Sequence, residues 1–281
     1  MWKLMVALCF VAFGAAAEQQ KVLLAGRTYL IDLPANPNGA LIVALHNASG
    51  NPEEFRLKTQ LSTQALAKGY AVAYPLGTGF SWNAFYCCGI AQQKNSADIR
   101  FLDLVISDAT ARFGLNAKRI YLTGMGNGSV MAETYAARRA SSIKAVAGVA
   151  GTIHLGRTPA TSVPMLHIHG LADTVVPYGL NGPENGSKRK KNPFTPVLVQ
   201  IKAFVGVHGQ LKKTSRVIDA KSDGTSVAED NYRDAAGRTQ VRLMTIVGGR
   251  HVWPGSERKG EGNTQEIGAT KEVLRFFAEH P

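Results

Sequence analysis

The segment from Arg119 to Met131 constrains this protein more than any other stretch of the sequence. It begins as an apolar strand and ends as the start of a helix, and Gly124, Gly126 and Gly128 stand at alternate positions between the two. A strand that turns directly into a helix through such glycines is the frame of a nucleophile elbow, in which Gly-x-Ser-x-Gly exposes a serine hydroxyl at the apex of a strained turn. Here the frame is intact and the apex is Gly126.

Strand-like and helix-like segments alternate along most of the chain, which predicts an α/β fold with a mostly parallel central sheet flanked by helices. After an N-terminal hairpin (22–24 and 29–33), strands are expected at 41–45, 70–74, at the elbow, and at 145–149, 165–168 and 241–247. Helices are expected at 55–68, 96–113, 129–140, 196–207 and 265–279, the second with Ser96 as its N-cap. The length suits one large domain, expected at residues 18–281.

Residues 1–17 have the pattern of a cleaved signal peptide. Lys3 gives a positive start, residues 4–14 are apolar, and residues 15–17 are three alanines before Glu18. The apolar run is short for a bilayer span, so we expect a secreted protein, periplasmic or extracellular, without stable membrane insertion after cleavage. The alternative is an uncleaved membrane anchor.

Cleavage removes Cys9 and leaves only the adjacent pair Cys87 and Cys88. A bond between neighbouring cysteines is feasible but strained. Because neither has another cysteine to pair with, we do not expect a disulfide-stabilised protein.

The formal net charge of +12 includes a basic run at Lys188, Arg189, Lys190 and Lys191. The run lies in a Gly- and Pro-rich insertion, residues 178–193, which suits a rim or lid over the site. Contact with an acidic polymer or surface is one interpretation of the run, and a solvated loop is the other. No nucleic-acid-binding motif accompanies it, so no nucleic-acid partner is expected.

Polar residues follow the strands at the edge where α/β sites form. Asn47, after the strand 41–45, and Asn127, after the apex, occupy the positions whose backbone N–H groups form an oxyanion hole beside such an elbow. Asp173 is placed to orient an imidazole, and His251, after two glycines, to act as general base. A turn-forming aspartate and a structural histidine are the alternatives.

The sequence resembles the secreted esterase family of polyhydroxybutyrate depolymerases and feruloyl esterases over roughly residues 22 to 280. The matching stretches are LH at 45–46, YPLGT at 74–78, WNA with CCG at 82–89, YLTG with NG at 121–128, HIHG with Asp173 at 167–173, VPY at 176–178, and GG with His251 and WPG at 248–255.

The resemblance implies an α/β-hydrolase fold that cleaves carboxylic esters outside the cell, small or polymeric, with no metal and no organic cofactor. It maps the family's serine onto Gly126, its acid onto Asp173 and its base onto His251. The chain departs from the family pattern near this site: Asn47, Ala48, Ser49 and Arg250 stand where glycine or cysteine is common. These departures put the oxyanion geometry in doubt.

Glycine has no Oγ, so no acyl-enzyme can form at Gly126. Ser129 lies about one helical turn away, too far to replace it. Trp82, Tyr86 and Trp253 suit either a substrate pocket, with the two tryptophans as candidate binding residues, or the core. Three hypotheses follow: a severely impaired ester hydrolase, a non-catalytic ester- or polymer-binding pseudoenzyme, and an error or deliberate inactivation at position 126.

Overall fold

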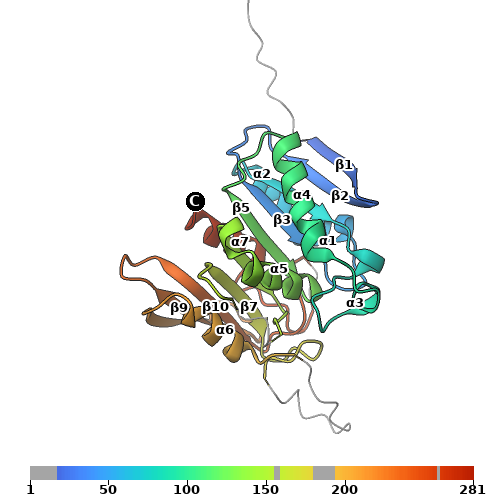
Figure 1. Cartoon of the computed structure of the whole chain (residues 1–281). Helices are drawn as coiled ribbons and strands as arrows, with labels where there is room; N and C mark the ends of the chain where they lie inside the picture. Colours follow the sequence, from blue (N-terminus) through green and yellow to red (C-terminus); the bar gives the residue numbers. More distant parts are fainter. Residues whose placement is uncertain (1–17, 155–158, 180–193, 258–259) are drawn as a thin grey trace, which may run out of the picture.

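The computed structural model describes residues 18–154, 159–179, 194–257 and 260–281. These residues form a ten-stranded sheet with the order β1-β2-β4-β3-β5-β6-β7-β10-β9-β8 (Figure 1). The strands are β1 Glu18–Leu24, β2 Arg27–Leu33, β3 Leu41–Leu45, β4 Ala71–Pro75, β5 Ile120–Met125, β6 Ala145–Val149, β7 Met165–Gly170, β8 Lys212–Ile218, β9 Ser226–Arg233 and β10 Thr239–Val247. The predicted signal peptide and the basic run lie outside the described residues.

The centre of the sheet is parallel and its two sides are antiparallel. β4, β3, β5, β6, β7 and β10 run in one direction, while β1–β2 and β9–β8 extend the sheet as hairpins. Strands β3 to β7 are buried at every residue, as expected for strands covered on both faces. The α/β prediction with a mostly parallel sheet is confirmed.

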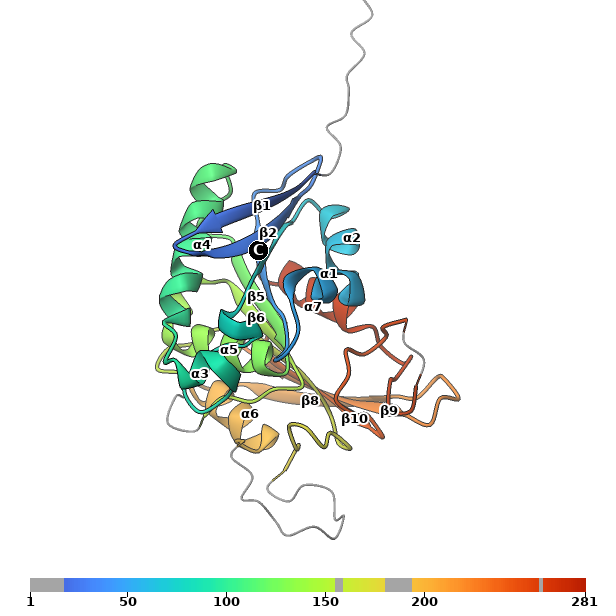
Figure 2. The same ribbon diagram turned by 90° about the vertical axis from the view of Figure 1, so that its right-hand side faces the viewer.

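Helices cover both faces of the sheet (Figure 2). They are α1 Pro52–Thr59, α2 Leu61–Leu66, α3 Gly89–Gln93, α4 Asp98–Arg112, α5 Asn127–Arg138, α6 Val197–Gly206 and α7 Ala269–Ala278, with 3-10 turns at Thr78–Phe80 and Ala140–Ser142. One apolar core joins α4, α5 and α6 to the sheet, and a second joins α1, α2 and α7 to the opposite face. The helices thus shield the central strands from water and leave their carboxyl ends at one edge.

Three helix predictions need correction. The helix expected at 55–68 is two helices, because Gln60 adopts a left-handed conformation with φ 52° between α1 and α2. The last helix begins at Ala269, after the extended Gly268. Ser96 does not cap α4: the cap position is Ala97, and the Ser96 hydroxyl bonds to Thr78 and Asp98 instead.

The sequence analysis missed the hairpin of β8 and β9. All but the last residue of β8 are exposed, so the strand lacks the apolar alternation by which a strand is recognised. Its ladder with β9 holds it at the edge of the sheet, and its last residue, Ile218, packs against the apolar core.

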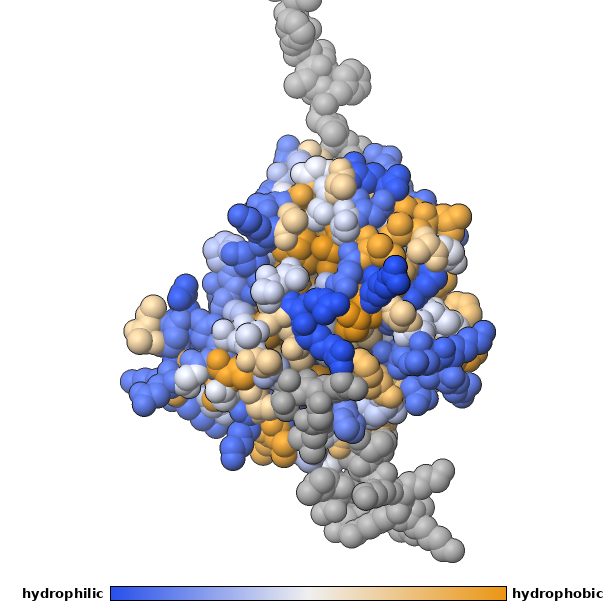
Figure 3. Space-filling view, viewed as in Figure 1, coloured by the Kyte–Doolittle hydropathy of each residue, from blue (hydrophilic) through white to orange (hydrophobic). Residues whose placement is uncertain are grey.

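The surface of this fold is mixed in character. On the face drawn in Figure 3, hydrophilic and hydrophobic residues lie side by side. Within the described ranges, no helix is both long and apolar enough to cross a membrane.

Candidate active site

The elbow predicted from the glycine pattern is a tight turn between β5 and α5. Gly126 has φ 54° and ψ −122°, a backbone conformation that side chains disfavour. Its two flanking glycines allow close packing: a Cβ on Gly128 would collide with the carbonyl oxygen of Leu45, and one on Gly124 would meet the backbone of Gly128 at 2.5 Å. The turn therefore keeps the backbone of an elbow, with no side chain at its apex.

Asp173 and His251 meet beside this turn. His251 Nδ1 donates to Asp173 Oδ2 at 2.8 Å, and the other carboxylate oxygen accepts from the backbone N–H groups of Val175 and Val176 at 2.8 and 2.9 Å. Asp173 has no exposed surface. The carboxylate therefore holds the imidazole in the orientation that a general base requires.

The charge of Asp173 is stabilised by its neighbours. Burial alone raises the pKa of a carboxyl group, but hydrogen bonds from His169 and His251 outweigh burial and hold the pKa of Asp173 below its usual range. Because His251 Nδ1 bonds to the ionised Asp173, the other ring nitrogen, Nε2, is the atom that faces the elbow.

Gly126 lies directly in front of that nitrogen. A Cβ built on Gly126 would stand 3.0 Å from His251 Nε2, 3.3 Å from its Cε1 and 3.5 Å from the Cβ of Asn47. The structure thus brings together Gly126, Asp173 and His251, and places Asn47 beside them.

The loop that carries Asn47 is fixed by a buried histidine. Gly77 N–H donates to His46 Nε2 at 3.0 Å, so the ring carries its proton on Nδ1 and donates to the Asn47 carbonyl at 2.8 Å. Burial lowers the pKa of His46 to about 4, so the ring is neutral near pH 7. In the same loop Ser49 has φ 62°, a left-handed conformation that glycine adopts more readily than serine.

The side chain of Asn127 supports the site rather than facing it. Its Oδ1 accepts from Trp82 N–H at 2.6 Å and its Nδ2 donates to the Trp82 carbonyl at 2.9 Å. This pair of bonds clamps the loop that follows β4 onto the start of α5. Any oxyanion contribution of Asn127 therefore comes from its backbone N–H.

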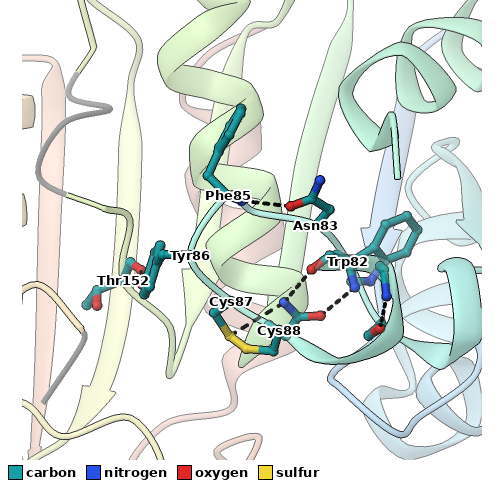
Figure 4. Close-up of a disulfide and its surroundings, with 10 residues drawn as sticks. Trp82, Asn83, Phe85, Tyr86, Cys87, Cys88 and Thr152 are labelled. Atoms are coloured by element: carbon teal, nitrogen blue, oxygen red, sulfur yellow. Dashed lines mark hydrogen bonds between the residues drawn. A yellow bond between two sulfur atoms is a disulfide. The ribbon is translucent and has the colours of Figure 1, made fainter. Parts of the chain in front are cut away.

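The same loop contains a vicinal disulfide between Cys87 and Cys88, across a cis peptide bond (Figure 4). Asn127 Nδ2 lies 3.9 Å from Cys87 Sγ, and the Tyr86 hydroxyl donates to the Thr152 carbonyl. The structure therefore contains the vicinal disulfide that the sequence analysis regarded as feasible.

The two tryptophans do not line a substrate site. Trp82 and Trp253 are 0% and 1% exposed. The Trp82 indole donates to the His46 carbonyl at 3.0 Å, while Trp253 donates to Thr270 at 3.0 Å and packs edge-on against Phe55. Their substrate-binding role is corrected to packing, because neither ring offers a free face.

Ser129 points away from the elbow. It is fully buried, and its Oγ lies 2.5 Å from the position of a Cβ on Gly148 of β6, beside Glu133. Its hydroxyl has no hydrogen-bond partner among the described residues. From this position it cannot attack a substrate held in front of His251.

The sequence analysis gave no role to His169, which touches the acid. His169 Nε2 lies 3.4 Å from Asp173 Oδ2. Two histidines at i and i+2 on a strand share one face of the sheet, and this was the available signal. Within the described part of the chain, no group of three His, Cys, Asp or Glu side chains is arranged to hold a metal ion.

A mostly parallel sheet whose elbow, aspartate and histidine loops converge at the carboxyl ends of β5, β7 and β10 is the architecture of the α/β-hydrolases. Residues 27–175 match the family described as "Esterase PHB depolymerase", just over half of the chain. The chain belongs to this family of ester hydrolases.

Curated relatives are also esterases. The chain is 28% identical over 258 residues to a protein of Nocardia uniformis subsp. tsuyamanensis named as the esterase NocK, covering 86% of this chain and 75% of the relative. It is 29% identical over 159 residues to a bifunctional acetylxylan esterase/xylanase of Neocallimastix patriciarum, and 25% identical over 244 residues to feruloyl esterase B of Piromyces equi. The matches cover 55% and 80% of this chain but 22% and 42% of those two relatives.

Solved structures share the fold. An acetyl xylan esterase from Aspergillus awamori superposes with a TM-score of 0.62 at 14% identity, covering 93% of this chain and 99% of that one. Esterase PE8 gives 0.56 at 15% identity, covering 95% and 100%. At these identities the likeness establishes the α/β-hydrolase fold alone.

Proposed function

We propose that this protein is an exported member of the esterase family that binds carboxylic esters and hydrolyses them only very slowly. One observation carries the proposal: the residue at the apex of the elbow is a glycine. A Cβ at this position would stand 3.0 Å from His251 Nε2. Without an Oγ, no acyl-enzyme forms there. The acid and the base beside it are in bonding contact, so both of these members of a triad are retained.

A slow residual reaction has a plausible chemical route. A water molecule bound in front of Nε2 would be within reach of the His251 imidazole, which would remove its proton as the water attacks the ester carbonyl. Backbone N–H groups of Asn47 and Asn127 are the candidate donors to the resulting oxyanion. Serine hydrolases that lack a triad member keep about 10³–10⁴-fold catalysis over water, and we expect this protein to fall in or below that range.

The names of two relatives support a ligand class. They are named for acetylxylan and feruloyl esters, so acyl or aromatic acyl esters of a polysaccharide are the first ligands to test. The predicted signal peptide supports export, and the basic run at 188–191 supports contact with an acidic polymer. A purely ligand-binding protein is the second candidate, favoured by Ser49 at φ 62° in the oxyanion loop.

The test compares native protein, Gly126→Ser and Gly126→Ala on p-nitrophenyl acetate. We expect near-background turnover for the native protein and for Gly126→Ala, and a gain of about 10²-fold or more for Gly126→Ser, because a nucleophile is worth on the order of 10⁶ in kcat in a complete site. Fast native turnover that His251→Ala leaves unchanged would contradict the proposal. If Gly126→Ser brings no gain in turnover, the ligand-binding candidate is favoured. Resequencing the codon for residue 126 tests the remaining hypothesis, an error or deliberate inactivation at that position.

A further inference from the structure

A line of buried polar side chains leads to Asp173 from the interior. Glu133 Oε1 lies 2.7 Å from His167 Nδ1, and His167 Nε2 lies 3.0 Å from His169 Nδ1. His169 Nε2 lies 2.8 Å from the Val176 carbonyl and 3.4 Å from Asp173 Oδ2. We call Glu133, His167 and His169 the buried relay; each is at most 1% exposed.

The two contacts of His169, at the end of the relay nearest the site, determine which ring nitrogens of the relay carry protons. Val176 O and Asp173 Oδ2 are both acceptors, so His169 Nε2 must carry a proton. Burial lowers the pKa of His169, so the ring is neutral and its Nδ1 is an acceptor. His167 must therefore donate from Nε2 to that atom.

The same reasoning continues to the interior end. Burial lowers the pKa of His167 to about 3, so this ring is neutral too and its Nδ1 is an acceptor. Glu133 must then donate a carboxylic O–H, and burial raises the pKa of Glu133 well above its usual value. Gln200 Nε2 lies 3.2 Å from His167 Nδ1 and bonds to the Glu133 carboxyl group, which partly offsets the effect of burial on the pKa of Glu133. The Gln200 amide is oriented by Ile153 N–H, which donates to Gln200 Oε1 at 2.6 Å.

Every donor of the relay thus points toward the acid. His169 holds the Val176 carbonyl, and the Val176 N–H donates to Asp173 Oδ1 at 2.9 Å. The imidazole of His169 therefore fixes both sides of the turn that presents Asp173, while its Nε2–H dipole favours a negative charge on the carboxylate.

We propose that His169 is a positioning residue that holds the Asp173 carboxylate in line with His251. The remainder of the buried relay fixes the tautomer of His169, and Glu133 acts as a neutral acid. The inference rests on the proposed function, because it concerns the same acid and base. The position of His169 and its effect on Asp173 are nevertheless tested without measuring ester turnover.

The experiment uses the full native chain labelled with nitrogen-15. Long-range proton–nitrogen spectra of the imidazoles between pH 6 and 8 are expected to show His167 and His169 as neutral rings protonated on Nε2. Glu133→Gln supplies an amide N–H in place of the acid O–H and should preserve both tautomers. A doubly protonated His167 in the native protein, lost in Glu133→Gln, would show an ion pair and overturn the proposal.

The positioning role is read from the proton shared by His251 Nδ1 and Asp173. His169→Leu should speed its exchange with water at least about 10-fold by loosening the acid, and His169→Gln, which keeps an N–H donor, should restore part of the protection. His208→Leu is the matched control, because His208 is a half-buried ring bonded to the Val163 carbonyl outside the relay. If His169→Leu fails to fold, His169→Gln and Glu133→Leu provide the same readout. Unchanged exchange in every folded relay variant would overturn the proposal, whatever the esterase assays show.

Discussion

The Nε2 atom of His251 lies 3.0 Å from the point where a Cβ on Gly126 would stand. This separation is shorter than an ordinary carbon–nitrogen contact. The imidazole therefore occupies part of the space that a side chain at the apex would need. The acid and the base are therefore in place beside an apex that has no side chain.

Gly126→Ser is expected to gain esterase activity at the expense of stability. A side chain at φ 54° and ψ −122° costs about 1–3 kcal/mol, and the imidazole must retreat by a few tenths of an ångström. Urea unfolding should show the loss of stability. Gly126→Ala is the control: it should lose as much stability without gaining activity, and an equal gain by Ala would show that the hydroxyl is not the cause.

Asp173→Asn should matter most where a nucleophile is present. In the Gly126→Ser protein, an amide at this position no longer fixes the tautomer of His251, and kcat should fall by about 10²–10⁴-fold, as in serine proteases. In the native protein the same change should alter the slow turnover far less. Steady-state kinetics of the native and Gly126→Ser proteins, each with and without Asp173→Asn, measure the difference. Equal effects in both backgrounds would contradict the role of Asp173 in orienting His251.

Asn127→Ala should release the loop that contains the vicinal disulfide. The change removes two hydrogen bonds to the Trp82 backbone, and leaving the buried groups unpaired costs about 1–3 kcal/mol each. Hydrogen exchange at the Trp82 amide should accelerate accordingly. Asn127→Asp keeps the acceptor for that amide and should protect it better than Ala does; identical exchange in the two variants would argue against the clamp.

Trp253→Phe tests whether this indole belongs to the core. It removes the bond to Thr270 and part of the packing on Phe55, so we expect a loss of about 1–3 kcal/mol. Ligand affinity, measured by calorimetry with a polysaccharide acyl ester, should not change. A weakened affinity with unchanged stability would restore the substrate-binding role.

Buried histidines should make the protein less stable in acid. Burial lowers the pKa of His46 to about 4 and of His167 to about 3, and also lowers that of His169. The unfolded chain takes up protons below about pH 6.5 while the folded protein does not, so the free energy of unfolding should fall by up to about 1.4 kcal/mol per pH unit for each ring.

Glu133 acts with the opposite sign. Its pKa is raised, so the folded protein keeps a proton that the unfolded chain releases above about pH 4.5. Above about pH 7, where the histidines no longer contribute, stability should therefore decline as the pH rises, until the folded protein also releases this proton. Urea unfolding from about pH 7 upward measures the slope, which Glu133→Gln should abolish. A native protein without the slope would mean that Glu133 is ionised in the folded protein, and a slope that persists in the variant would assign it to another group.

The convergence of Gly126, Asp173 and His251 was predictable because each follows a parallel strand, and parallel strands end at a common edge of the sheet. The glycine pattern also predicted the elbow, since glycines at 124 and 128 have few other reasons to flank a strand end. What sequence spacing does not contain is the direction in which a side chain points. For this reason Trp82 and Trp253 were candidates for the site and are found in the core.

The buried relay was beyond the reach of sequence reasoning. It needs α5 and α6 to place Glu133 and Gln200 over His167 of β7, and residues so far apart along the chain meet only through tertiary packing. The hairpin of β8 and β9 was missed for a different reason. A strand exposed on both faces, as β8 is, resembles a loop in its composition, and the buried face of β9 includes the polar Glu229 and Asn231.

That hairpin determines where the sheet stops. The outermost strand, β8, presents Lys212, Lys213 and Arg216 along its length, and Lys213 and Arg216 are paired with Asp230 and Glu229 of β9. A second molecule that approached edge to edge would set these cations against their own copies. Charged edges of this kind oppose the unwanted addition of strands, so the polarity that hid β8 from sequence analysis also guards the molecule against aggregation.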